Sequence, residues 1–132
     1  MKKKLQDLLN NSYTPYYQYS VAAIVIMKDG TEFGGVNVET SSPAAGICAE
    51  RNALYTAITF GYKKGDVKEI HVMSKTEDDC FPCFICRHAL SDFCDRDVKV
   101  FSHTYSDSRI VTHTVSELCP YPFSDDNLRG SL

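Results

Sequence analysis

The feature that most constrains the fold of this chain is an unbroken apolar run at residues 21–27, VAAIVIM. Such a run is typical of a strand that is covered on both faces, whereas a strand with one face in water alternates. The Asp29-Gly30 pair that follows suits a tight hairpin turn, and the next segment, 31–39, does alternate. The sequence therefore predicts a buried strand that pairs with its neighbour in a hairpin.

Helical and strand patterns alternate along the rest of the chain. Apolar residues at helical spacing predict three helices, and short β-branched runs predict three strands beyond the hairpin. The expected helices cover 3–10, 48–61 and 83–94, and the expected later strands cover 68–74, 98–102 and 109–115. Because strands alternate with helices, we expect an α/β fold of three α-β-α layers, in which a mixed five-stranded sheet has helices on both faces.

Length and composition limit the classes of function. The 132 residues fit one domain, 1–132. With 43% hydrophobic residues, 23% charged residues and a formal net charge of -3, the chain resembles neither a disordered protein nor a basic nucleic-acid binder. No stretch has the ~20 apolar residues of a membrane span or the pattern of a signal peptide. We expect a cytoplasmic protein whose partners include neither a membrane nor a nucleic acid polymer.

Six cysteines offer the most reactive side chains, at positions 48, 80, 83, 86, 94 and 119. Cytoplasmic thiols stay reduced, so clustered cysteines there more often bind metal or carry out redox chemistry than form disulfides. Cys48 opens one predicted helix, and the motif Pro82-Cys83-x-x-Cys86 opens another. A helix N-terminus lowers the pKa of a thiol, so these three cysteines favour the thiolate form that Zn²⁺ binds.

Three thiolates would leave the fourth tetrahedral position of zinc for water, which is the arrangement of catalytic zinc, whereas structural zinc needs a fourth protein ligand. The spacing leaves Cys80 open as that ligand. His71 and His103 lie in strand-like runs without a second donor at ligand spacing. Cys94 and Cys119 lie in apolar settings and fit small buried side chains better.

Glu50 favours the catalytic alternative. It follows Cys48 by two residues, where it can take a proton from a metal-bound water and pass it to a leaving group. An acidic residue in the first turn of a helix also complements the helix dipole, but the neighbouring cysteine motifs favour chemistry. On the strand expected at 31–39, Asn37 and Glu39 share one polar face.

A cysteine, then x-Glu, then Pro-Cys-x-x-Cys is the signature of zinc deaminases. The segments CAER at 48–51 and PCFICR at 82–87 resemble the cytidine deaminase family, in its small tetrameric branch with three cysteine ligands. The resemblance runs nearly end to end, through YTPYYQYSVAA at 13–23, GVNVE at 35–39 and TVSELCPYPF at 114–123.

This resemblance implies one zinc ion per chain, held by Cys48, Cys83 and Cys86, with Glu50 as the proton shuttle. Zinc-bound hydroxide would attack C4 of the base, and ammonia would leave. Arg51 and Arg87 each follow a ligand motif directly, and their guanidinium groups would hydrogen-bond the ligand sulfurs and offset the excess charge of three thiolates.

The resemblance also implies a nucleoside pocket. Asn37 and Glu39 would hold the ribose hydroxyls, and the N–H of Ala49 would meet the carbonyl of the base. Tyr19 stands where the family has a pocket-lining phenylalanine. Phe123 would reach the active site of a neighbouring subunit in a homotetramer.

The expected activity is the hydrolytic deamination of cytidine and 2'-deoxycytidine to uridine and 2'-deoxyuridine, in pyrimidine salvage. Four features depart from the family pattern, and they affect the expected pocket shape and subunit contacts rather than the chemistry. They are Phe84, His88, Ala22 and the loop 41–46. The alternatives are a deaminase of another aminated nucleoside such as a blasticidin-type antibiotic, a structural zinc module, and a Cys-x-x-Cys thiol oxidoreductase. A polynucleotide deaminase is disfavoured by the acidic balance of charge.

Overall fold

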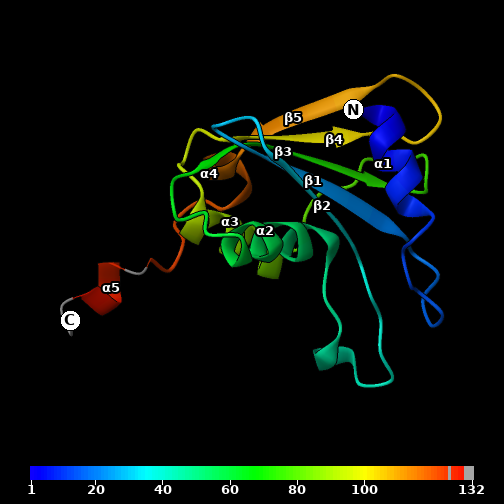
Figure 1. Cartoon of the computed structure of the whole chain (residues 1–132), viewed down its shortest axis with the longest axis horizontal. Coiled ribbons are helices and arrows are strands. Elements are labelled where there is room, and N and C mark those ends of the chain that lie inside the picture. The colour runs from blue at the N-terminus through cyan, green and yellow to red at the C-terminus, as the bar shows by residue number, and fades with distance from the viewer. Residues whose placement is uncertain (125, 130–132) are drawn as a thin grey trace.

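A mixed five-stranded sheet forms the centre of the computed structural model, which describes residues 1–124 and 126–129 (Figure 1). The strands lie in the order β2-β1-β3-β4-β5. Only the β3–β4 pair is parallel among the described strand pairs, and the connection between these two strands includes a helix. The strands are β1 (Val21–Met27), β2 (Glu32–Val36), β3 (Val67–Ser74), β4 (Lys99–His103) and β5 (Ile110–Thr114).

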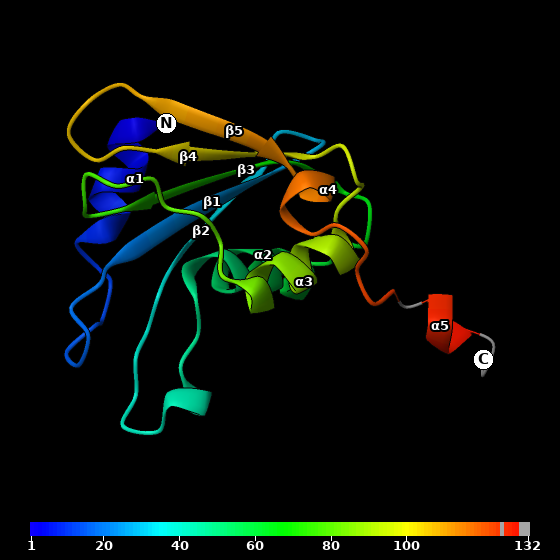
Figure 2. The same cartoon turned by 180° about the vertical axis from the view of Figure 1, so that it is seen from behind.

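Helices cover both faces of this sheet, which confirms the predicted α-β-α layers (Figures 1 and 2). Helix α1 (Lys2–Leu9) lies on one face, and α2 (Ala49–Thr59) and α3 (Phe84–Phe93) lie on the other. No helix among the described residues is long and apolar enough to span a membrane.

The two faces of β1 explain why its sequence is apolar throughout. Ala23 and Val25 are fully buried in the core beneath α2 and α3, whereas Ala22 and Ile24 are buried beneath α1. Leu5 of α1 packs on this second face. Every side chain of β1 thus enters one of two cores, as the unbroken run predicts.

Two neighbouring glycines of β2 sit against different helices. A Cβ built on Gly35 would lie 2.5 Å from the backbone nitrogen of Ala53 and 2.6 Å from the backbone oxygen of Ala49. A Cβ on Gly34 would instead meet the side chain of Leu8 at 2.9 Å. The first turns of α2 therefore pack directly on the backbone of β2 at Gly35. Only glycine permits two backbones to approach this closely.

Three short helices were not predicted: η1 (Pro43–Ala45), α4 (Val115–Leu118) and α5 (Asp126–Arg129). Two strands, β2 and β5, end earlier than predicted. A capping box between Thr114 and Glu117 starts α4 and ends the strand expected to reach residue 115. Strand β2 ends at Val36, because Val38 forms isolated bridges with Tyr13 and Ile47 instead of continuing the ladder with β1.

Candidate active site

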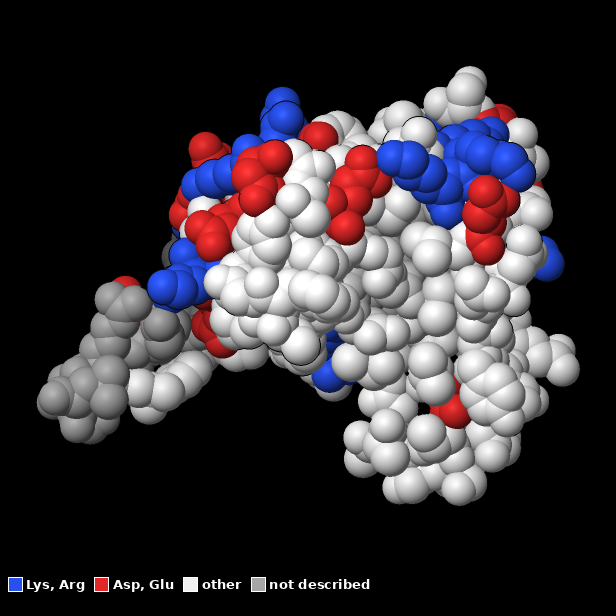
Figure 3. Space-filling view, viewed as in Figure 1, with Lys and Arg blue, Asp and Glu red and all other residues white. Residues whose placement is uncertain are grey.

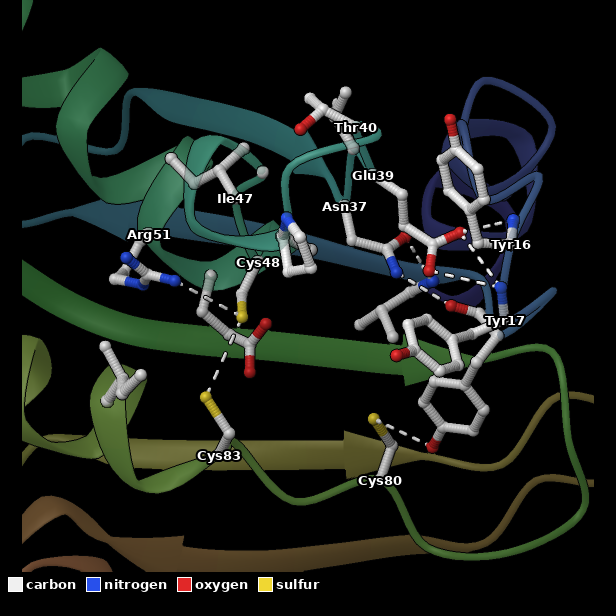
Figure 4. A pocket seen from close by; sticks show the side chains of 18 of the residues that line it. Tyr16, Tyr17, Asn37, Glu39, Thr40, Ile47, Cys48, Arg51, Cys80 and Cys83 are labelled. Atoms are coloured by element: carbon white, nitrogen blue, oxygen red, sulfur yellow. Dashed lines mark hydrogen bonds between the residues drawn. The ribbon is translucent and has the colours of Figure 1, made fainter.

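Three cysteine sulfurs meet where α2 and α3 begin. Cys48 is the N-cap of α2, Cys83 is the N-cap of α3, and Cys86 lies in the first turn of α3. Their Sγ atoms all lie within 4.8 Å of one another, and those of Cys48 and Cys83 are 3.7 Å apart (Figure 4). Among the described residues, this is the only group of three or more Cys, His, Asp or Glu side chains placed to hold one metal ion.

The chemistry of this donor set fits zinc. A hydrogen bond with the Cys86 thiol and the nearby Arg51 guanidinium lower the pKa of Cys48 to about 5, and the same hydrogen bond raises the pKa of Cys86. Two sulfurs thus compete for one proton at a point where two helix N-termini add positive potential. A Zn²⁺ ion satisfies all three sulfurs as thiolates.

Arg51 and Arg87 lie differently with respect to these sulfurs. The Arg51 Nη2 donates to Cys48 Sγ over 3.5 Å, and its Nε is buried without a partner in the described structure. The Arg87 guanidinium instead donates to the carbonyl oxygens of Pro82 and Leu118 and lies over the ring of Phe84. The structure therefore brings Arg51, but not Arg87, to a cysteine sulfur.

Glu50 lies in the first turn of α2 and is only 4% exposed. Burial raises the pKa of its carboxyl group to about 7, and the neighbouring Cys48 adds to this rise. A carboxyl group with a pKa near neutrality can both accept and donate a proton at physiological pH. Its side chain lines the same cavity as Cys48 and Cys83.

This cavity has a volume of ≈ 590 Å³, and Figure 4 shows it from close by. The sulfurs of Cys48 and Cys83 lie toward one end, and Asn37 and Glu39 lie toward the other. Its lining includes both polar and aromatic side chains, among them Tyr16, Tyr17, Tyr19, Asn37, Glu39, Cys48, Ala49, Glu50, Arg51, Cys80, Phe81 and Cys83. A space of this size suits a small organic molecule.

Asn37 and Glu39 are both fixed by hydrogen bonds at their end of the cavity. The Asn37 side chain accepts from the backbone N–H of Val21 over 2.8 Å and donates to the Tyr19 carbonyl over 2.7 Å. The Glu39 carboxylate accepts from the backbone N–H groups of Tyr16 and Tyr17 over 3.1 and 3.2 Å (Figure 4). The two polar side chains therefore have defined orientations before any ligand binds.

The remaining predicted residues divide between the cavity and the surface. Ala49 is fully buried at the first position of α2, where its N–H has no acceptor within the helix. Tyr19 also lines the cavity. Phe123 is 59% exposed and is not among the described lining residues of its own chain. It belongs to the segment after α4 that leads away from the body of the molecule (Figure 2).

The structure also places the other candidate ligands and three of the departures from the family pattern. His71 Nδ1 lies 2.8 Å from His103 Nε2, and Cys80 contacts Tyr19 Oη at 3.9 Å, so none of the three joins the sulfur cluster. Phe84 and His88 are not among the described lining residues, whereas the loop 41–46 contributes Ser41, Pro43 and Gly46 to the wall.

Several lining residues were missed by the sequence reasoning. Tyr16 and Tyr17 bind Glu39 through their backbone across more than 20 positions, a pairing that no local pattern encodes. Phe81 could have been found, because an aromatic residue directly before a Pro-Cys-x-x-Cys motif must lie close to the metal ligands.

Comparisons with known proteins agree with this site. Residues 1–102 match the model of the family described as "Cytidine and deoxycytidylate deaminase zinc-binding region". A cytidine deaminase of Halalkalibacterium halodurans is 36% identical over 117 residues, which cover 89% of this chain and 86% of that protein. A probable cytidine deaminase of Dictyostelium discoideum is 35% identical over 131 residues, covering 96% of this chain and 86% of the relative.

A solved structure gives the same result for the fold. The cytidine deaminase from Burkholderia pseudomallei superposes with a TM-score of 0.86 at 29% sequence identity, covering 92% of this chain and 94% of that chain. Fold, sulfur cluster and sequence thus agree, and the chain belongs to the cytidine and deoxycytidylate deaminase family with its zinc-binding region.

Proposed function

We propose that this protein is a zinc-dependent cytidine deaminase, which hydrolyses cytidine to uridine and ammonia. One observation carries the proposal: two cysteines of the three-sulfur cluster, Cys48 and Cys83, and a buried glutamate line one end of a cavity whose other end holds an oriented Asn37–Glu39 pair. The names of the relatives agree with this activity.

Cys48, Cys83 and Cys86 would hold the zinc ion, which when bound acidifies a water molecule and so supplies a nucleophile at neutral pH. The Glu50 carboxylate takes a proton from the attacking water and delivers it to ring nitrogen N3. The second proton of that water, carried by the hydroxyl group now on C4, passes through Glu50 to the exocyclic amine as the C4–N bond breaks, so that C4 becomes a carbonyl and ammonia leaves. The raised pKa of Glu50 suits this exchange in both directions.

The other residues bind and orient the nucleoside. The free N–H of Ala49 donates to the carbonyl oxygen of the base. Glu39 accepts hydrogen bonds from the ribose hydroxyls, and Asn37 fixes the Tyr19 backbone beside it. The Arg51 guanidinium, through its hydrogen bond with Cys48 Sγ, reduces the excess negative charge of three thiolates around one divalent ion.

The charges of the cavity favour a nucleoside over a nucleotide. Its described charged lining residues are Glu39, Glu50 and Arg51, and Arg51 is engaged with Cys48. A phosphate group would find no free cation and would meet the Glu39 carboxylate. We therefore propose cytidine and 2'-deoxycytidine as substrates, in pyrimidine salvage in the cytoplasm.

We further propose a homotetramer in which Phe123 enters the active site of a neighbouring subunit. In support, the Phe123 ring is exposed and does not line its own cavity. An apolar ring that another chain covers would account for that exposure. Sedimentation should give the mass of four chains, and an active monomer would contradict the arrangement.

The test of function is an ultraviolet assay of the purified zinc-loaded protein. We expect loss of the absorbance of cytidine and 2'-deoxycytidine, and little or no loss with CMP or cytosine. Turnover of a blasticidin-type compound but not of cytidine would reassign the substrate. About one zinc per chain without any turnover would indicate a structural zinc module, and a readily formed disulfide without metal would indicate a thiol oxidoreductase.

A further inference from the structure

Phe81 is an apolar side chain that the proposed chemistry leaves without a role. Phe81 is one of the residues that line the cavity, and it is 42% exposed. Along the chain it lies between Cys80, which contacts the Tyr19 hydroxyl, and the Pro82-Cys83 pair that begins α3. Along the chain, Phe81 therefore lies between the residue that contacts Tyr19 and the first cysteine of α3, both of which line the cavity.

The segment that carries Phe81 is held on both sides. The Ser102 hydroxyl of β4 donates to the Cys80 carbonyl oxygen over 2.7 Å, and Arg87 Nε donates to the Pro82 carbonyl oxygen over 2.7 Å. Both backbone neighbours of Phe81 are thus fixed by side chains from other elements. A wall that is fixed in this way binds a flat ligand without first having to become ordered.

The ring itself is positioned by His113 of β5. The centroids of the two rings are 5.3 Å apart at an interplanar angle of 77°, an edge-to-face contact. Such pairs have a preferred geometry, so His113 restricts the rotation of the Phe81 ring. With this contact in place Phe81 is still 42% exposed, and it forms part of the cavity wall.

We infer that Phe81 is a specificity-determining residue that packs against the pyrimidine ring from within the same chain, and that His113 is its positioning residue. The inference rests on the proposed function, because it takes the occupant of the cavity to be a nucleoside. It assigns to this chain an aromatic wall of its own, in addition to any ring that a neighbouring subunit supplies.

The experiment compares Phe81→Ala with the wild-type protein, both zinc-loaded, in cytidine turnover and in binding of uridine by calorimetry. We expect KM for cytidine and Kd for uridine to rise together by about tenfold, with kcat changed less than threefold and zinc content unchanged. Phe60→Ala is the matched control, because Phe60 is an exposed phenylalanine that contacts another ring, that of Phe33, but does not line the cavity.

Variants of His113 show whether this residue positions the Phe81 ring or only contributes to the stability of the fold. We expect His113→Ala to raise KM by about threefold and His113→Phe to restore the wild-type value, because it retains an aromatic edge. In the Phe81→Ala background, His113→Ala should add nothing further, since the ring that it positions is gone.

The outcomes distinguish this inference from the proposed function. If the wild-type protein deaminates cytidine and Phe81→Ala has an unchanged KM for cytidine and an unchanged Kd for uridine, the role of Phe81 is overturned. The proposed deaminase activity then still stands. A changed sedimentation mass with unchanged KM and Kd also overturns it, by assigning Phe81 to a subunit contact. A wild-type protein that neither deaminates cytidine nor binds uridine refutes both.

Discussion

Helix α1 packs on one face of the sheet through leucine side chains, whereas α2 packs on the other face with its backbone against Gly35. The α1 face encloses an apolar core and one pair of neutral histidines, His71 and His103. The α2 face has its own apolar core, but the N-termini of α2 and α3 beside it hold all three cysteines of the metal centre and Glu50.

This difference shows which kind of packing a reactive site requires. Contacts between side chains tolerate small shifts, because a leucine can change its rotamer. Contacts between two backbones do not, so α2 has one position relative to β2, and Cys48 and Glu50 are fixed with it. On the face seen in Figure 3, basic and acidic residues gather around α1 and along the top of the view, and few appear lower down.

The largest effect on activity should come from a substitution on the α2 face, at Glu50. We expect Glu50→Gln to lower kcat for cytidine by at least ~100-fold, because the amide has the shape of the carboxyl group but cannot transfer the proton. The variant should retain its fold by circular dichroism and its zinc by metal analysis. A kcat close to that of the wild-type protein would remove Glu50 from the mechanism.

The two glycines of β2 test the difference between the faces directly. We expect Gly35→Ala to lower the free energy of unfolding by about 2–3 kcal/mol and to weaken zinc binding, because the new methyl group meets the backbone of α2. Gly34→Ala, its matched control, should cost less than about 1 kcal/mol, since the Leu8 side chain can move aside. Urea unfolding and zinc titration measure both, and equal losses for the two variants would contradict the comparison.

A smaller effect is expected at Arg51. Arg51→Gln should lower kcat by about tenfold with the fold and the zinc content retained, because the hydrogen bond with Cys48 Sγ and a positive charge are lost. Arg51→Lys keeps the charge but loses the planar donor group, so its kcat should lie between those of the wild-type protein and Arg51→Gln. Unchanged turnover at full zinc occupancy would show that the thiolate charge needs no such partner.

The smallest effect belongs to the α1 face and depends on pH. Burial lowers the pKa of His103 to about 4 and also lowers the pKa of His71, so both imidazoles are neutral in the folded protein at pH 7. The unfolded chain, with histidine pKa values near 6.5, binds more protons between pH 6.5 and 4, so stability falls as the pH drops through this window. We expect a loss of about 1 kcal/mol by pH 5.

The measurement is urea unfolding of the wild-type protein and of His103→Gln at pH 7.5 and pH 5. The variant retains one histidine of the pair and should lose less stability than the wild-type protein between these two pH values. Equal losses in the two proteins would show that the pair does not cause the pH dependence.

Sequence reasoning succeeded where a local pattern determines the structure. The unbroken apolar run of β1, the helix starts at Cys48 and Cys83 and the cysteine spacing are all local patterns. Each leads to an element or a cluster that the structure contains. It failed where a partner is distant in the chain. The end of β2 depends on the bridges of Val38 with Tyr13 and Ile47, and the contacts of Arg87 depend on Leu118, so neither could be read from neighbouring residues.

The bridge between Val38 and Ile47 has a consequence for how such a pocket can diversify. Two backbone hydrogen bonds of 3.0 Å join these residues and close the loop between them at its base, immediately before Cys48. Substitutions or insertions within 40–45 therefore remodel one wall of the cavity without displacing Cys48, whereas a side chain at Gly46 would meet the Val38 backbone oxygen of the bridge itself. What this pocket admits can thus be changed through the loop while the reacting groups keep their positions.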